Sequence, residues 1–185
     1  QRKEAFTAIC GKPVISSHDN HAAIENELRS NLLKSGGVAY VEEDPAAFLD
    51  LDIVIDLITT LGGIPCYPVL LDDPKGNITE FEADPEQLYE ELTRRDVYCI
   101  ELIPGRNDFN VLKDFVGFFS ERRFVITFGT EHNTPALDPL TVTCRGGVPL
   151  DDDLQKVANA GCQVIAAHQY LRAKGEEGYL SADGK

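Results

Sequence analysis

The sequence predicts an α/β protein with a mainly parallel sheet. Helical and strand-like segments alternate along the chain in the order helix, strand, helix, strand, helix, strand, which is typical of βα units. The strand-like segments are apolar throughout, and this pattern indicates burial on both faces of the sheet. At 185 residues, with 43% hydrophobic and 26% charged residues, the chain has the size and composition of one globular domain spanning residues 1–185.

The elements of the first half are defined by their capping and stop signals. A helix is expected over about 18–34, where a glycine pair ends it, and a short strand is expected over 38–41. A second helix is expected over 51–61, with Asp50 as its N-cap and a second glycine pair at its end. The segment IPCYPVLL, residues 64–71, is expected to be extended and buried, and its two prolines make it irregular.

The second half repeats the alternation. A helix is expected over 84–95, because an aspartate cap is followed by proline at the first helical position. A strand over 97–103, an amphipathic helix over 110–123 and a strand over 124–128 follow. A final helix is expected over 151–174. Its apolar face consists of Leu154, Val157, Ala158, Gly161, Ile165, His168 and Leu171.

Composition excludes several classes of function. The chain has only 17 Lys and Arg residues but 31 Asp and Glu residues. The resulting net charge of −14 argues against a nucleic-acid partner. No apolar run approaches the roughly 18 residues that a membrane span needs, and QRKEAF does not read as a secretory signal. Five scattered cysteines without a CxxC pair indicate reduced thiols in a cytoplasmic protein, and Cys66 is interpreted as a core thiol.

Polar residues gather where three strands are expected to end. The three groups are Tyr67, Asp72 and Asp73; Glu101, Arg106, Asn107 and Asp108; and Glu131, His132 and Asn133. In parallel α/β proteins the carboxyl ends of the strands meet at one edge, where ligands bind. Arg106 follows Pro104 and Gly105 on such a loop, and its guanidinium group is a candidate contact for a phosphate or carboxylate. An ordinary surface arginine is the alternative.

The pair Glu131 and His132 combines a carboxylate with an imidazole, which are ligands of Zn, Mn or Fe. Neighbours on an extended segment point opposite ways, so one side chain would bind metal while the other orients or packs. A polar loop with a helix cap at Asn133 or Thr134 is the alternative. His168 lies on the apolar face of its helix and is expected to be a hydrogen-bonded core histidine.

Two longer stretches resemble a known family. GGVAYVEEDPAAFLDLDIVIDLITTLGGIPCYPVL resembles the part of PHP-domain (polymerase and histidinol phosphatase) phosphoesterases in which a short apolar segment precedes a helix, a glycine pair and a buried strand. VYCIELIPGRNDFNVLKDFVGFFSERRFVITFGTEHNTP resembles their closing part, where the last strand ends in a Gly-Ser-Asp-x-His motif. The resemblance covers residues 36–135, the second half of such a domain, and residues 1–35 would match a helical insertion.

The resemblance implies part of a distorted (β/α)7 barrel, similar to a TIM barrel, that hydrolyses phosphate esters with divalent metal ions. Such ions lower the pKa of a bound water and neutralise charge on phosphoryl oxygens. Glu131 and His132 would then be catalytic and, with Asn133, would hold Mn, Zn or Mg. The substrate, a small phosphorylated molecule, would be bound by Arg106, Tyr67 and Glu101.

The departures from the family pattern leave alternatives open. The opening His-x-His motif has no counterpart, the histidine of Ala-His-Pro falls on Val69 or Tyr67, and GTEHN replaces the final motif. The sequence therefore predicts a metal-dependent hydrolase that is incomplete without an N-terminal half or a second copy. The main alternative is a catalytically inactive PHP-derived binding or scaffold domain. A third interpretation is a lyase or isomerase that uses Glu131 and His132 as acid and base without metal.

Overall fold

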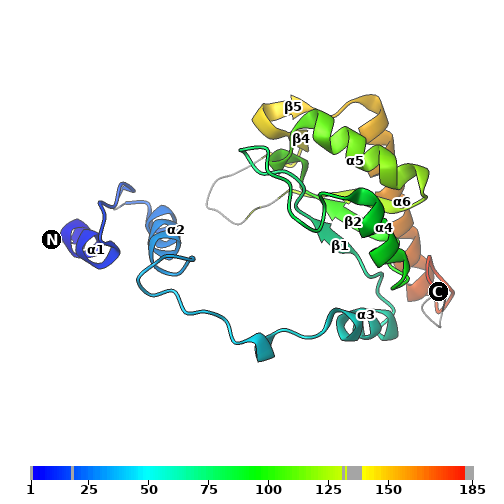
Figure 1. Ribbon diagram of the computed structural model, residues 1–185, viewed down its shortest axis with the longest axis horizontal. Coiled ribbons are helices and arrows are strands. Elements are labelled where there is room, and N and C mark those ends of the chain that lie inside the picture. The colour runs from blue at the N-terminus through cyan, green and yellow to red at the C-terminus, as the bar shows by residue number, and fades with distance from the viewer. Residues whose placement is uncertain (1, 18, 131, 133–138, 182–185) are drawn as a thin grey trace. The chain divides into compact units, whose positions relative to one another are not determined.

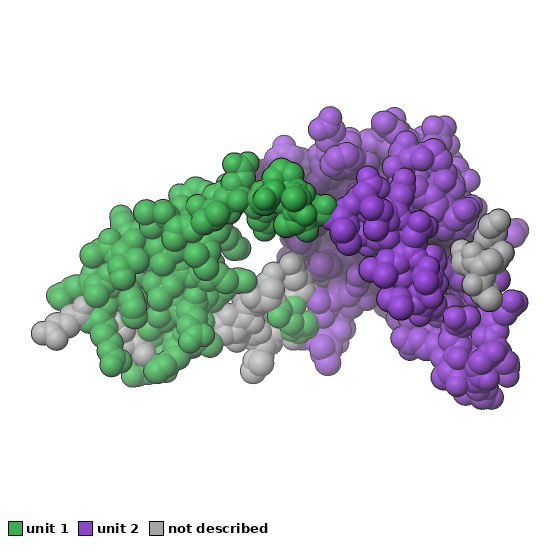
Figure 2. Space-filling view, turned by 90° about the horizontal axis from the view of Figure 1, so that it is seen from below, with its two compact units in different colours: residues 1–48, 132–138 green, residues 49–131, 139–185 purple. Residues whose placement is uncertain are grey.

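The chain divides into two compact units (Figure 2). The computed structural model describes residues 2–17, 19–130, 132 and 139–181 (Figure 1). Unit 1 comprises residues 1–48 and 132–138, and unit 2 comprises residues 49–131 and 139–185. The division into two units does not test the prediction of a single domain over residues 1–185, which stays a prediction.

Unit 1 is built from short helical elements. They are α1 (Arg2–Cys10), α2 (His21–Leu32) and the 3-10 turn η1 (Pro45–Ala47). Asn20 caps α2 by accepting the backbone N–H of Ala23 at 3.0 Å, so the helix expected over 18–34 begins three residues later. The Glu27 carboxylate accepts the backbone N–H groups of Ile15 and Ser16, which ties the preceding loop to α2.

The strand expected over residues 38–41 is wrong. This segment forms turns, and the side chains of Val38 and Val41 are 78% and 79% exposed. The backbone N–H of Ala39 donates to the carbonyl of Leu32 at the end of α2, so it is used locally and not in a sheet. A strand needs a pairing neighbour to satisfy its backbone, and no strand pairs with this segment among the described residues.

Unit 2 holds the predicted α/β arrangement. Its principal elements are α3 (Leu51–Thr60), β1 (Tyr67–Val69), α4 (Pro85–Thr93), β2 (Cys99–Leu102), α5 (Phe109–Glu121), β3 (Val125–Phe128) and α6 (Asp152–Ala173). The short elements are η2 (Pro104–Arg106), β4 (Thr143–Cys144), η3 (Arg145–Gly147) and β5 (Val148–Pro149). The strands β1, β2 and β3 pair in that order, all parallel, which confirms the α/β class and the parallel sheet.

The helices of unit 2 begin where their aspartate caps predict. Asp50 accepts the backbone N–H of Asp52 at the start of α3, and Asp84 does the same for Glu86 and Gln87 in α4. Both caps are confirmed. The last helix, α6, lies within the 151–174 range expected for it. All seven residues of its predicted apolar face are buried or half-buried.

One face of the sheet carries the core. The side chains of β1, β2 and β3 that face it pack with those of α4 and α5, which lie together on one side of the sheet (Figure 1). The members are Val69, Ile100, Leu102, Ile126, Leu88, Leu92, Leu112, Phe115 and Phe119. The expected burial of both faces is only partly right, because Glu101 of β2 and Pro68 of β1 point the other way and are exposed.

The outer edge of β3 is covered by α6. Val125 and Gly129 direct their backbone N–H groups to β2, so the carbonyl of Ile126 points away from β2. A Cβ atom on Gly161 of α6 would lie under 3.0 Å from that carbonyl oxygen, so the helix backbone itself rests on the strand edge. The described strands thus form an open sheet whose β3 edge is shielded by a helix.

His168 is a hydrogen-bonded core histidine, as the sequence predicts. It is 5% exposed, its Nε2 lies 2.8 Å from the carbonyl oxygen of Gly62, and its Nδ1 accepts the backbone N–H of Tyr179 at 3.1 Å. Because Nδ1 accepts, Nε2 carries the proton and donates to Gly62. One imidazole therefore joins α6 to the loop after α3 and to the C-terminal segment.

Replacing His168 with alanine is expected to loosen both attachments. Gly62 and Tyr179 would each lose a buried partner, so the free energy of unfolding should fall by about 2 kcal/mol. Hydrogen exchange read by mass spectrometry should show faster exchange at the amide of Tyr179. Gln169→Ala, at the exposed neighbouring position, is the control and should change neither quantity. Equal protection of Tyr179 in His168→Ala and in the parent chain would contradict the assignment.

Candidate functional site

The carboxyl ends of β1 and β2 bring together members of two of the three predicted polar groups. Both strands run in the same direction and are paired through Val69 and Leu102, so the loops that follow them leave the sheet at one edge. The first loop carries Asp72 and Asp73, and the second carries Arg106. The sequence-based expectation that these side chains share one edge is confirmed for these two strands.

A buried ion pair joins this edge to the β4–β5 region. The Asp72 carboxylate, whose side chain is 2% exposed, lies 2.8 Å from Nη2 of Arg145. It also accepts the backbone N–H of Asp108 at 3.2 and 3.3 Å. Arg145 in turn donates from Nε to the carbonyl of Arg106 at 2.9 Å and from Nη2 to the carbonyl of Asp72 at 3.0 Å. The guanidinium group therefore fixes both loops at once.

A second buried carboxylate shapes the loop after β1. Glu82 is 3% exposed and accepts the backbone N–H groups of Leu70 at 3.0 Å and Leu71 at 2.8 Å. It also accepts the hydroxyl of Thr79. Leu71 has a φ of 59°, in the left-handed region that a branched side chain rarely adopts. The two N–H bonds to Glu82 compensate for that strain and turn the chain sharply at the strand end.

Asn107 links the two loops from within. Its side chain is completely buried, and its Nδ2 donates to the carbonyl oxygens of Leu70 at 2.9 Å and Asp72 at 3.3 Å. Its own carbonyl accepts the backbone N–H of Arg145 at 2.9 Å. Its Oδ1 has no hydrogen-bond partner among the residues that the structure describes. The amide of Asn107 and the guanidinium group of Arg145 thus connect the two loops in the protein without a ligand.

A hollow of about 600 Å³ opens between these loops. Its polar lining consists of Asp72, Asp73, Asn77, Thr79, Arg106 and Arg145. The carboxylate of Asp73 is turned onto its own loop, where it accepts the backbone N–H groups of Lys75 at 2.7 Å and Asn77 at 2.9 Å. Its bond with the Asn77 side chain, followed by these backbone bonds, lowers the pKa of Asp73.

Arg106, predicted to contact substrate, lines this hollow together with Arg145, which the sequence analysis missed. Arg145 uses Nε and Nη2 for the contacts with Asp72 and Arg106. Its Nη1 group makes no hydrogen bond within the part of the chain that the structure describes. The only local signal for Arg145 is its position before two glycines, which predicts a turn and not a site.

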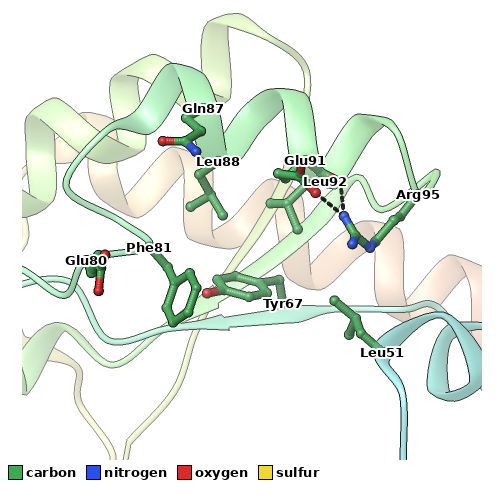
Figure 3. Close-up of a pocket in the computed structure, with 9 residues that line it drawn as sticks. All are labelled: Leu51, Tyr67, Glu80, Phe81, Gln87, Leu88, Glu91, Leu92 and Arg95. Carbon is green, nitrogen blue, oxygen red and sulfur yellow. Dashed lines mark hydrogen bonds and ion pairs between the residues drawn. The ribbon is translucent and has the colours of Figure 1, made fainter.

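Tyr67, also predicted to contact substrate, lies in a different pocket. It begins β1, and its ring lines a cavity of about 410 Å³ beside Phe81 and α4 (Figure 3). Burial, and secondly the charge of Glu82, raises the pKa of Tyr67, so the phenol stays protonated at neutral pH. On the α4 side of the pocket, Arg95 is held by Glu91 and Asp52. Tyr67 and Arg106 therefore do not line a common site.

Glu101 lies on the exposed face of β2. A Cβ atom on Gly129 would come within 2.9 Å of its Oε1, so the carboxylate rests against the glycine that begins GTEHN. Glycine at position 129 is what permits this approach. Of the other predicted residues, Glu131 and Asn133 lie outside the described residues. His132 is exposed and belongs to unit 1, whereas the hollow belongs to unit 2.

No cluster of three or more His, Cys, Asp or Glu side chains suited to a metal ion occurs among the described residues. The metal set predicted at Glu131, His132 and Asn133 falls largely outside them and stays a prediction. No described helix is long and apolar enough to cross a membrane.

Comparison with models of known protein families, with curated proteins and with solved structures finds no match to this chain.

Proposed function

We propose that the hollow beyond β1 and β2 binds a small phosphorylated molecule. The observation that supports this is the presence of two arginines, Arg106 and Arg145, in one hollow of a chain whose net charge is −14. A guanidinium group presents planar N–H donors that match phosphate oxygens in pairs. Arg145 is already held in place by Asp72, so little conformational freedom is lost when it contacts a ligand.

The carboxylates of the hollow do not oppose this proposal. Asp72 is neutralised by Arg145, and Asp73 is engaged by N–H groups of its own loop. Thr79 and Gly105 add small residues to the lining beside the arginines. An anion of the size of a phosphate ester fits a hollow of about 600 Å³ together with its organic group.

The reaction that we propose for this ligand is metal-dependent hydrolysis of its phosphate ester, as the PHP resemblance implies. Glu131, His132 and Asn133 offer carboxylate, imidazole and amide oxygen, a donor set that suits Mn, Zn or Mg. A bound metal would supply an activated water at neutral pH. Arg106 and Arg145 would hold the phosphoryl oxygens and orient the ester. The barrel that the resemblance implies would need the β3 edge, now covered by Gly161 of α6, to pair with another strand.

The second candidate is a catalytically inactive binding domain. The ion pair between Arg145 and the buried Asp72 favours it, because a carboxylate neutralised by arginine is a poor metal ligand and Asp72 therefore could not supplement the ligands of segment 129–133. Both candidates share the anion-binding hollow and differ only in whether segment 129–133 provides a metal.

One experiment on the 185-residue chain separates the candidates. Binding of inorganic phosphate would be measured by calorimetry, and hydrolysis of para-nitrophenyl phosphate would be followed with Mn²⁺, Zn²⁺ or Mg²⁺ and with chelator. Arg106→Gln is expected to weaken phosphate binding about tenfold or more, because charge-assisted hydrogen bonds are lost. Arg94→Gln, at an exposed arginine paired with Glu91, is the matched control and should bind as the parent does.

Each outcome has a definite meaning. Metal-stimulated hydrolysis that disappears in the double variant Glu131→Gln, His132→Ala supports the hydrolase. Phosphate binding that ignores chelator, with no hydrolysis, supports the binding domain. If the parent chain does not bind phosphate, or if Arg106→Gln and Arg94→Gln bind it equally, the hollow is not the phosphate site.

A further inference from the structure

Two thiols from neighbouring strands lie next to each other at the amino end of the sheet. Cys66 directly precedes β1 and Cys99 begins β2, and their Sγ atoms are 3.3 Å apart. Tyr67 stands beside Ile100 in the parallel register, so the residues one position earlier are neighbours too. Cys99 is 1% exposed, whereas Cys66 is exposed, and the interpretation of Cys66 as a core thiol is therefore wrong.

The two thiols titrate as a pair. Their mutual hydrogen bond raises the pKa of Cys66 and lowers the pKa of Cys99. Partial desolvation of its sulfur and the charge of Glu101 add to the increase in the pKa of Cys66. The pair consequently releases its first proton more readily than a lone thiol does and holds the second more firmly. A thiolate is the reactive form of cysteine, so this pair is primed for oxidation in a way that a single thiol is not.

The backbone around the pair suits a covalent bond. Adjacent strands in a sheet lie about 4.8 Å apart, and disulfides join Cα atoms about 4.4–6.8 Å apart. The register next to Tyr67 and Ile100 and the 3.3 Å between the sulfur atoms place Cys66 and Cys99 as cross-strand neighbours, so we expect a bond between them to need rotation of side chains and no large shift of the strands. Because Cys66 is exposed, a small oxidant can reach its sulfur, whereas the sulfur of Cys99 is buried next to it.

We propose that Cys66 and Cys99 form a dithiol site that a peroxide oxidises reversibly to an intramolecular disulfide. In the first step the pair has lost one proton, the remaining proton passes along the S–S hydrogen bond to Cys99, and the sulfur of Cys66, then a thiolate, attacks one peroxide oxygen. The S–O bond forms, the O–O bond breaks, and hydroxide leaves and takes up a proton as water. In the second step the sulfur of Cys99 attacks the Cys66 sulfenic acid. The S–S bond forms, the S–O bond breaks and a second water leaves, so two thiols are oxidised and one peroxide is reduced.

The remaining cysteines do not compete for this role. Cys144 is 1% exposed, and burial, followed by nearby carboxylates, raises its pKa and makes it unreactive. Cys10 is half-buried in unit 1, and Cys162 is exposed on α6. Within the described chain, the only two sulfur atoms recorded in contact with each other are those of Cys66 and Cys99.

The disulfide would close a loop that contains α4 and the two carboxylates that line the hollow, Asp72 and Asp73. Closing such a loop removes conformational entropy from the unfolded chain, so the melting temperature should rise by about 5 °C or more. The proposal does not depend on ligand binding in the hollow, because the two thiols lie at the other end of strands β1 and β2.

The test uses hydrogen peroxide in small molar excess on the 185-residue chain, followed by intact mass and peptide mapping without reductant. The expected result is a loss of 2 Da, a linked peptide pair that contains positions 66 and 99, and full reversal by dithiothreitol. Cys66→Ser and Cys99→Ala should each abolish the 2 Da loss. Cys162→Ser, which removes another exposed thiol, is the control and should keep it.

Three results would overturn the proposal. They are a disulfide-linked dimer in place of the internal bridge, a gain of 32 Da at Cys66 without a linked peptide, and retention of all five thiols under the same exposure. Peptide mapping of the parent chain decides the matter even if Cys99→Ala fails to fold, because it needs no variant.

Discussion

Replacing Arg145 with alanine is expected to lower the free energy of unfolding of unit 2 by about 2–3 kcal/mol. Among the described residues, the substitution leaves the Asp72 carboxylate, whose side chain is 2% exposed, with the backbone N–H of Asp108 as its one remaining donor. It also removes the donor to the carbonyl of Arg106. Arg145 itself is 29% exposed, so water would compensate part of the loss, and the estimate lies below that for a fully buried pair.

Urea unfolding followed by circular dichroism would measure the effect. Arg94→Ala is the matched control, because its ion pair with Glu91 is exposed on both sides and should contribute little to stability. Adding Asp72→Asn to Arg145→Ala should recover part of the stability, because no charge then remains buried without a partner. A loss in Arg145→Ala no larger than that in Arg94→Ala would show that the ion pair does not hold the loops.

Gly161→Ala is expected to destabilise unit 2 by about 2 kcal/mol or more, although alanine favours helices over glycine. The new methyl group would overlap the carbonyl oxygen of Ile126, which belongs to backbone and cannot rotate away. Helix α6 would have to move away from the edge of β3. Because Leu154 and Val157 belong to this helix, their contacts with the core would weaken.

The matched control is Gly117→Ala in α5. Apart from the backbone of α5 itself, no described atom lies within 4 Å of the Cβ position at Gly117, so the same substitution there should stabilise the chain by about 0.5–1 kcal/mol through helix propensity alone. The two substitutions therefore should shift the melting temperature in opposite directions. A stabilising Gly161→Ala would mean that α6 does not rest on the β3 edge.

Local signals predicted most elements of unit 2 correctly. Asp50 and Asp84 stand where a helix must satisfy its first N–H groups, and this need is met within three residues of the cap. The apolar face of α6 followed from a spacing of three or four residues, including His168. The prediction of a strand over residues 38–41 was wrong, because a short apolar run becomes a strand only when a neighbouring strand pairs with it.

The candidate site was predictable only in part. Arg106 and Asp72 were expected at one edge because parallel strands end together, and both line the hollow. Tyr67 was predicted to lie with them, whereas it is the first residue of β1 and lines another pocket. Arg145 gave no signal, since its partner Asp72 lies 73 residues away along the chain.

The sequence by itself determined the α/β class, the order of the principal helices and strands from α3 to β3 and on to α6, and the residues that cap α3 and α4, whereas it did not predict the short strands β4 and β5. These features depend on capping hydrogen bonds and on hydrophobic periodicities that span a few residues, so short stretches of sequence are enough to predict them. Only the tertiary structure decided which distant groups meet: Asp72 with Arg145, Gly161 with Ile126, and Cys66 with Cys99. Each of these contacts joins segments at least 33 residues apart, and their approach is set by packing of the whole unit, which no local pattern encodes.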